Sequence, residues 1–309
     1  MPSAPTDSFQ SAWAAIASVE GWLAKEEARA LHEAASAVPS GRWIVEIGTH
    51  HGRSTTAMVT GKRPEVPMLT IDPYGGPTAT MPPDNLRAFC DNMDRVGAGP
   101  EVQLFWGTSE EARRLSGVFV TAQVRAGGAV QAAAEATAGH DVRLFADAGE
   151  EAEQCRRRVF RVDGAATRQP QDVPAALPCE VQIGLLFVDG KHDRASVLLD
   201  MDLWEPLVAN GGLVVFHDAF FRRGVTRALF ERHLLNWDFR YERSLVNTSI
   251  FRRAGPLDTA AVIISGLRLT ARTVHFARNV ATTVGVRRDW RWLQRVLPPS
   301  PDFEYDPVR

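Results

Sequence analysis

The chain has 309 residues, 45% of them hydrophobic and 23% charged, and its formal net charge is −2 at pH 7. These values are typical of a globular protein that can bury a sizeable core, and the small net charge argues against bulk electrostatic binding of nucleic acid. The three cysteines, Cys90, Cys155 and Cys179, lie far apart. An odd number of widely spaced cysteines indicates a reducing compartment rather than a disulfide framework or a cysteine metal site.

The N-terminus lacks the basic start and the apolar core of a signal peptide. No apolar run reaches the roughly 20 residues that a membrane-spanning helix needs. We therefore expect a cytoplasmic protein without a transmembrane segment, whose partner is a small molecule and not a nucleic acid.

The first predicted element is a helix over residues 8–38, where apolar residues recur at helical spacing. Short apolar runs follow at 43–47, 68–71, 102–106, 184–188 and 212–216. Helix-like segments such as 195–208 lie between them. This alternation predicts an α/β fold with a doubly wound, mostly parallel sheet, and ligands bind such sheets at the carboxyl ends of the strands.

Two segments interrupt the alternation. Residues from about 115 to 180 are rich first in Ala and Gly and then in Arg, and we expect an insertion of unknown role there. After Gly255 the strand-like sequence gives way to a helical tail that carries several arginines. The breaks divide the chain into an N-terminal helical segment (1–41), a central domain (42–255) and a C-terminal helical tail (256–309).

A glycine turn follows the first apolar run. In the stretch Trp43–Ala57, Gly48 and Gly52 separate a strand from a helix start, with the acid Glu46 just before them. Such a turn lets a ligand approach the backbone and the helix amides. The spacing is not G-x-G-x-x-G, which counts against NAD or FAD, and no P-loop motif occurs. A tight turn without a ligand fits the same residues.

Acids and histidines end the later strands. Asp72 ends the second run, where an acid can accept hydrogen bonds from both hydroxyls of a ribose, although an acid before proline is also a common turn former. Asp189 and His192 follow the fourth run, and His217 and Asp218 follow the fifth. Carboxylates in such a cluster can hold a divalent cation, and a histidine can accept a proton near neutral pH. The alternative is that the acids cap turns and the histidines form a polar rim; two such strand ends on one edge favour a functional site.

Taken in order, these motifs resemble those of the class I S-adenosylmethionine-dependent methyltransferases. The chain is similar to the branch with E-I-G-x-x-x-G-x-S-T, D-G-x-H and G-G-x-x-x-x-H-D, which includes macrolide-sugar and, more distantly, catechol-type O-methyltransferases. The resemblance covers about residues 21–253, apart from the expected insertion. It implies a Rossmann-like sheet of about seven strands whose last strand is antiparallel, with the end hairpin in residues 241–253.

The resemblance also implies S-adenosylmethionine as the cofactor. Glu46, Gly48 and Gly52 would line its methionine part, and Asp72 would hold its ribose. Thr108 and Ser109 would lie beside the adenine.

The resemblance further implies a catalytic centre assisted by Mg²⁺ or Mn²⁺. His192 would be the general base, and Asp189, His217 and Asp218 would match metal-binding positions. The similar enzymes carry a carboxylate where this chain has His217, and imidazole suits transition metals better than magnesium. Either the metal differs, His217 is not a ligand, or no metal binds.

The expected function is therefore methylation of a small-molecule hydroxyl by an S-adenosylmethionine-dependent enzyme. The first alternative is a non-catalytic binding or scaffold protein that retains the cofactor fold and works through its insertion and its tail, where Arg268 and Arg272 belong to one predicted polar stripe. The second is an NAD-type oxidoreductase, which the missing dinucleotide motif disfavours. A homo-oligomer that forms through the terminal helices is compatible with the sequence.

Overall fold

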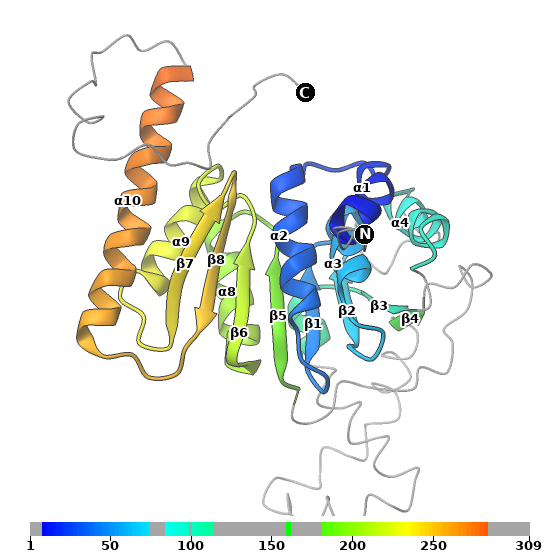
Figure 1. Ribbon diagram of the computed structural model, residues 1–309, viewed down its shortest axis with the longest axis horizontal. Coiled ribbons are helices and arrows are strands. Elements are labelled where there is room, and N and C mark those ends of the chain that lie inside the picture. Colours follow the sequence, from blue (N-terminus) through cyan, green and yellow to red (C-terminus); the bar gives the residue numbers. More distant parts are fainter. Residues whose placement is uncertain (1–7, 75–83, 99–100, 114–158, 162–180, 284–309) are drawn as a thin grey trace, which may run out of the picture.

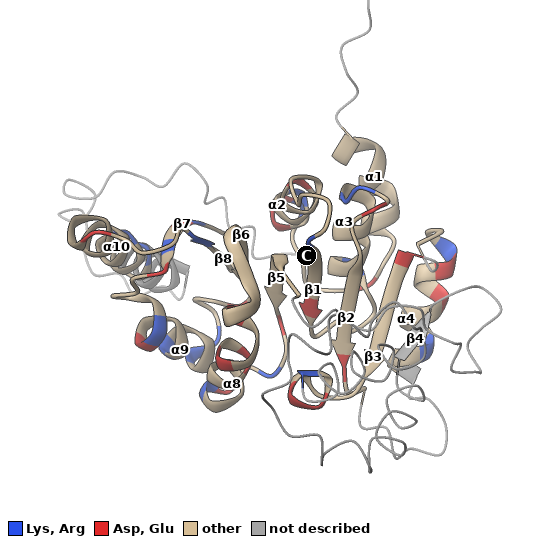
Figure 2. Ribbon diagram, turned by 90° about the horizontal axis from the view of Figure 1, so that it is seen from below, with Lys and Arg blue, Asp and Glu red and all other residues tan. Residues whose placement is uncertain are grey.

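The computed structural model describes residues 8–74, 84–98, 101–113, 159–161 and 181–283. Within them the chain forms a central sheet with helices on both faces (Figures 1 and 2). The predicted α/β fold with a mostly parallel sheet is confirmed. Apart from 159–161, the expected insertion lies outside the described residues, as does the tail after Thr283.

Eight strands form one sheet in the described part of the chain, in the order β4-β3-β2-β1-β5-β6-β8-β7. The strands are β1 (Trp43–Ile47), β2 (Met68–Asp72), β3 (Val102–Trp106), β4 (Val159–Arg161), β5 (Ile183–Val188), β6 (Val208–Phe216), β7 (Phe239–Leu245) and β8 (Thr248–Arg253). Neighbours from β3 to β6 pair in parallel, while β4, β8 and β7 pair antiparallel with their neighbours. The expected end hairpin is β7–β8. The prediction of about seven strands did not include β4, a three-residue edge strand inside the segment that was expected to be an insertion.

The helices connect the strands and flank the sheet. They are α1 (Ser8–Ala17), α2 (Lys25–Ser36), α3 (Arg53–Gly61), α4 (Asp84–Arg95), α8 (Arg194–Trp204), α9 (Arg223–His233) and α10 (Thr259–Thr283). Figure 2 shows α1, α2 and α3 on one face of the sheet and α8 and α9 on the other. None of the helices in these residues has the length and apolar character required to cross a membrane.

The N-terminal prediction of one helix over 8–38 was wrong, because the structure has two helices there. The side chain of Glu27 accepts a hydrogen bond from the backbone N–H of Ala24 at 2.9 Å. This contact satisfies a donor that a helix start leaves unpaired, so a second helix begins after Ala24. The predicted helix 195–208 is also shorter, since α8 ends at Trp204 and a 3₁₀ turn that contains Pro206 leads into β6.

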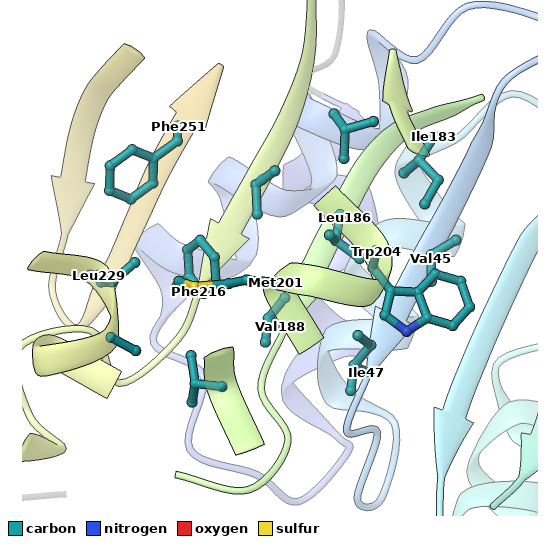
Figure 3. Packing of buried hydrophobic residues seen from close by; sticks show 14 of the residues in the cluster. Val45, Ile47, Ile183, Leu186, Val188, Met201, Trp204, Phe216, Leu229 and Phe251 are labelled. Atoms are coloured by element: carbon teal, nitrogen blue, oxygen red, sulfur yellow. The ribbon is translucent and has the colours of Figure 1, made fainter. Parts of the chain in front are cut away.

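Alternate residues of the central strands face opposite layers. Trp43, Val45 and Ile47 of β1 belong to the core beneath α8 and α9, whereas Ile44 belongs to the core beneath α1 to α4. Figure 3 shows Val45 and Ile47 packed with Trp204 of α8. Because both faces are covered, β1 and β5 are buried along their whole length, which explains why all their residues are apolar except the buried Glu46 of β1.

The residues that α10 exposes differ from those of the polar stripe expected for the tail. Arg268 is exposed, but Arg272 is buried and its guanidinium lies 3.5 Å from the carbonyl oxygen of Val246. The apolar side chains of Ile263 and Leu267 are exposed instead. The helix therefore packs on the hairpin turn through a face that includes an arginine.

Replacing Trp204 with Ala should destabilise the fold by about 3 to 5 kcal/mol, because the indole is 0% exposed and its removal leaves a large cavity. Urea unfolding measures this change in the free energy of unfolding. As a control, Trp237→Ala removes an indole that is 54% exposed and should cost about 0.5 kcal/mol or less. A similar loss in both variants would contradict the packing described.

Candidate active site

Four neighbouring strands end at one rim. The backbone N–H of Gly48, just after β1, donates to Ile71 of β2 at 2.8 Å. The N–H of Asp189, just after β5, donates to Ile47 of β1 at 2.8 Å, and that of His217, just after β6, donates to Val188 of β5 at 3.1 Å. The residues that follow these strands are thus held side by side.

A cavity of about 1280 Å³ opens above this rim. Its lining includes these residues predicted for the site: Gly48, Asp72, Thr108, Ser109, Asp189, His192, His217 and Asp218. The predicted residues Glu46 and Gly52 are not among the lining residues. The volume exceeds the roughly 300–1,000 Å³ of a typical small-molecule pocket, so it has room for more than one ligand.

Both glycines of the turn have backbone conformations that side chains disfavour. The φ angles of Gly48 and Gly52 are 86° and 88°. A Cβ atom on Gly48 would lie 2.2 Å from the carbonyl oxygen of Asp189, and one on Gly52 would lie 2.7 Å from Met93. The turn therefore brings the ends of β1 and β5 into direct backbone contact, which side chains would prevent.

Glu46 lies beneath the turn and is fully buried. Its carboxyl group accepts hydrogen bonds from Ser54 at 2.5 Å and Thr55 at 2.6 Å, both in the first turn of α3. Burial raises the pKa of Glu46 to about 8, although these hydrogen bonds oppose the shift. In this structure Glu46 ties β1 to the start of α3; its contact with a cofactor stays a prediction.

Asp72 organises the same turn from β2. One carboxylate oxygen accepts the backbone N–H groups of Thr49 at 2.8 Å and His50 at 3.1 Å, and the other accepts the N–H of Tyr74 at 2.8 Å. The first oxygen also receives the hydroxyl of Thr49 at 3.4 Å, so both of its lone pairs are in use, whereas the second keeps one lone pair for a further hydrogen bond. The side chain is half-buried.

Thr108 and Ser109 follow β3 and are engaged differently. Thr108 contacts Glu111 through its N–H at 3.0 Å and its hydroxyl at 3.3 Å, which closes the turn before the next segment. The hydroxyl of Ser109 donates to Asp200 of α8. Burial raises the pKa of Asp200 to about 6 in spite of this hydrogen bond. Asp200 was not predicted for the site.

Asp189, His192 and Asp218 form a compact group of polar side chains on the rim. The Nε2 atom of His192 lies 3.4 Å from Asp189 and 3.5 Å from Asp218. One potential ligand atom from each of the three lies within 4.8 Å of the others, a spacing that an ion could bridge. The group differs from the predicted metal set because it contains His192 in place of His217.

His217 lies behind this group, between two carboxylates. Its Nδ1 atom is 3.1 Å from Asp189 and its Nε2 atom is 3.6 Å from Glu27 of α2, the second being an ion-pair distance. Burial alone would lower the pKa of His217, but Asp189 and Glu27 together hold it well above its usual value. Both ring nitrogens of His217 therefore face protein carboxylates, and His217 is not part of the group of three side chains whose spacing an ion could bridge.

Glu27 and Asp200 are polar residues that sequence reasoning missed. Glu27 is 1% exposed and also accepts hydrogen bonds from the N–H of Asn247 at 2.9 Å and the hydroxyl of Thr248 at 2.8 Å. Nothing in the local sequence marks it for the site, since Asn247, Thr248 and His217 lie far away in the chain. Asp200 had a signal, because it interrupts the apolar face that Val197, Met201 and Trp204 form on α8.

Comparison with known proteins identifies the family. A family model described as "Methyltransferase domain" matches residues 45–219, more than half of the chain and the part that carries the rim. The chain belongs to this methyltransferase family. The expectation of a methyltransferase enzyme and the resemblance to the class I S-adenosylmethionine-dependent enzymes are therefore confirmed.

Several solved methyltransferase structures are similar to this methyltransferase at low identity. An O-methyltransferase from Bacillus cereus in complex with S-adenosylhomocysteine has 10% identity and a TM-score of 0.46, and the alignment covers 82% of this chain and 93% of the other. TomG from Streptomyces achromogenes, in complex with S-adenosylmethionine, has 12% identity and a TM-score of 0.44, with 82% and 92% covered. CalS11, a TDP-rhamnose 3′-O-methyltransferase, has 13% identity and a TM-score of 0.39, with 82% and 96% covered. Membership of the family rests on the sequence match, and a search of curated proteins by sequence found no match.

Replacing Glu46 with Gln should stabilise the methyltransferase increasingly as the pH rises. The folded state keeps the Glu46 proton up to a pKa of about 8, whereas the unfolded state releases it near 4.5, so wild-type stability is lost between these pH values. The advantage of Glu46→Gln should be small at pH 4.5 and reach a few kcal/mol, on the order of one to three, above pH 8.

Urea unfolding at pH 5, 6.5 and 8 measures this difference. The control Glu33→Gln changes an exposed carboxyl group on α2 and should leave the pH dependence as in the wild type. An advantage of Glu46→Gln that does not grow with pH would show that Glu46 is ionised in the fold.

Proposed function

We propose that this methyltransferase transfers the methyl group of S-adenosylmethionine to a hydroxyl group of a small molecule. The observation that carries the proposal is the placement of Asp72, Asp189 and Asp218 around one cavity above the Gly48 turn. Family membership supplies the class of reaction, and the carboxylates next to a histidine supply groups suited to activating an alcohol.

The cofactor part of the cavity is assigned to the ends of β1, β2 and β3. Gly48 lets the cofactor approach the backbone, Asp72 accepts a ribose hydroxyl through its remaining lone pair, and Ser109 with Thr108 lies beside the adenine. The dominant polar groups here are carboxylates, which suit a cofactor whose sulfonium and amine are cationic.

In the proposed reaction the acceptor oxygen attacks the methyl carbon in line with the carbon–sulfur bond. That bond breaks, its electron pair stays on sulfur, and S-adenosylhomocysteine leaves as a neutral thioether. The sulfonium already activates the methyl group, so the protein mainly aligns the two reactants, which can lower the barrier by on the order of 7 kcal/mol. His192 takes the acceptor proton at Nε2 and contributes typically a further factor of about 10² or more.

The donor set of Asp189 and Asp218 fits a hard divalent cation such as Mg²⁺ or Mn²⁺, whereas His217 faces Asp189 and Glu27 and is not part of the group. When bound, the ion would act as a Lewis acid that lowers the pKa of a nearby hydroxyl. The proposal gives the ion to the two carboxylates and keeps His192 as the base, because one nitrogen cannot bind a metal and accept a proton at the same time.

Calorimetric titration with S-adenosylhomocysteine tests whether the protein binds the cofactor. The reaction is tested by incubating the protein with S-adenosylmethionine and a panel of sugar, polyketide, phenol and peptide hydroxyls, and by measuring the S-adenosylhomocysteine that is produced. Wild-type protein should bind the nucleoside, and a ligand at 100 times its Kd should stabilise the fold by about 2.7 kcal/mol. A scaffold protein that has lost the cofactor site would neither bind S-adenosylhomocysteine nor be stabilised by it, and that result would contradict the proposal.

Titration with Mn²⁺ separates the ion from the base. His192→Ala should abolish methyl transfer while the affinities for Mn²⁺ and S-adenosylhomocysteine stay within about threefold of wild type, whereas Asp189→Asn should weaken Mn²⁺ binding about tenfold or more. Equal loss of Mn²⁺ affinity in both variants would make His192 a metal ligand instead of the base.

A further inference from the structure

The cavity is lined by more acids than bases. Its acidic lining residues are Glu20, Glu26, Asp72, Glu110, Asp189, Asp200 and Asp218. Its basic lining residues are Arg53, Lys191 and Arg222. The acids favour the sulfonium and the amine of the proposed cofactor, but they repel the carboxylate at the end of its methionine part. A cation near that end would offset this repulsion and strengthen binding of the whole cofactor.

Two of the three lining cations have acidic partners. Lys191 lies 3.5 Å from Asp193, and Arg222 lies 3.3 Å from Asp218. Arg53 has no carboxylate partner within the described residues, and its Nε atom is buried without a hydrogen-bond acceptor there. Among the described residues, Arg53 is thus the cavity-lining cation whose charge no carboxylate balances.

Arg53 is also in the right place along the chain. It is the first residue of α3 and follows Gly52, so it belongs to the glycine turn assigned to the methionine part. Its guanidinium donates to the carbonyl oxygen of Gly21 at 3.0 Å and lies 5.8 Å from the ring centre of Trp13. These two contacts hold the side chain in place and use one of its five N–H donors, which leaves donors free for a carboxylate.

We propose that Arg53 binds the carboxylate of the methionine part of S-adenosylmethionine and so selects for the complete amino-acid end of the cofactor. The inference rests on the proposed function. Arg53 lies between Gly52 and Ser54, at a position where the motif specifies no residue, and the inference gives this position a role in cofactor recognition. Guanidinium is suited to this role because its planar donors match the two oxygens of a carboxylate.

The competing role of Arg53 is structural, since its bond to Gly21 holds the N-terminal loop over the cavity. A structural role predicts that its loss lowers thermal stability and weakens every nucleoside ligand alike. Recognition predicts a loss confined to ligands that carry the carboxylate. The two roles therefore differ in a binding experiment that needs neither an acceptor nor turnover.

The experiment is calorimetric titration of the full chain with two probes. One is S-adenosylhomocysteine, and the other is its decarboxylated analogue, which keeps the amine, the thioether and the adenosine. Arg53→Gln should weaken S-adenosylhomocysteine about 10- to 100-fold, the size of a hydrogen bond to a charged group, and leave the analogue within about twofold. Arg53→Lys should give a smaller loss because it keeps the charge without the planar donors.

The control Lys191→Gln removes another lining cation and should preserve the wild-type preference for S-adenosylhomocysteine over the analogue. Unchanged affinity of Arg53→Gln for S-adenosylhomocysteine, or an equal loss for both probes, would overturn the inference and leave the proposed function standing. Failure of the wild type to bind either probe would overturn the proposed function, and the inference with it.

Discussion

The site depends on the register of four strands in a sheet. Because β2, β1, β5 and β6 are parallel neighbours, the first residues beyond β1, β5 and β6 each donate a backbone hydrogen bond to the strand beside them. Gly48, Asp189 and His217 are thus placed by backbone bonds and not by loop conformation. A site on strand ends inherits the rigidity of the core, which suits the proposed methyl transfer because that reaction depends on alignment of the two reactants.

The rim and the layer beneath it hold ionisable groups that are partly or fully buried, and the charge of each is compensated in a different way. Glu46 is buried without a cation and is held neutral by its raised pKa. Asp189 keeps its charge because His217 and His192 lie against it and lower its pKa although burial opposes this. His217 in turn is balanced by Glu27 from the N-terminal segment. Buried charges of this kind stay ionised only when such partners are present, so the reactive surface rests on a second layer of charges beneath it.

The sequence predicted the parts of this arrangement that depend on local pattern. Uninterrupted apolar runs predict strands buried on both faces, and the residues after them, such as Asp189 and Asp218, therefore share an edge. Local pattern could not predict the break between α1 and α2, because the Glu27 contact that starts α2 competes with a continuous helical periodicity. It also could not show that Glu27 reaches His217, since that pairing depends on how α2 packs on the sheet. The glycines were predicted for ligand access, yet Gly48 and Gly52 are also required by close packing with Asp189 and Met93.

Glu27 has a consequence for how the chain acquires its structure. Its carboxylate accepts hydrogen bonds from Asn247 and Thr248, more than two hundred positions further along the chain. During synthesis the residues of α2 leave the ribosome long before those of the β7–β8 turn are added to the chain. The carboxylate of Glu27 therefore has no access to these partners for most of synthesis. Such distant pairings slow folding, and the N-terminal helices reach their final environment only when the last hairpin has been added to the sheet.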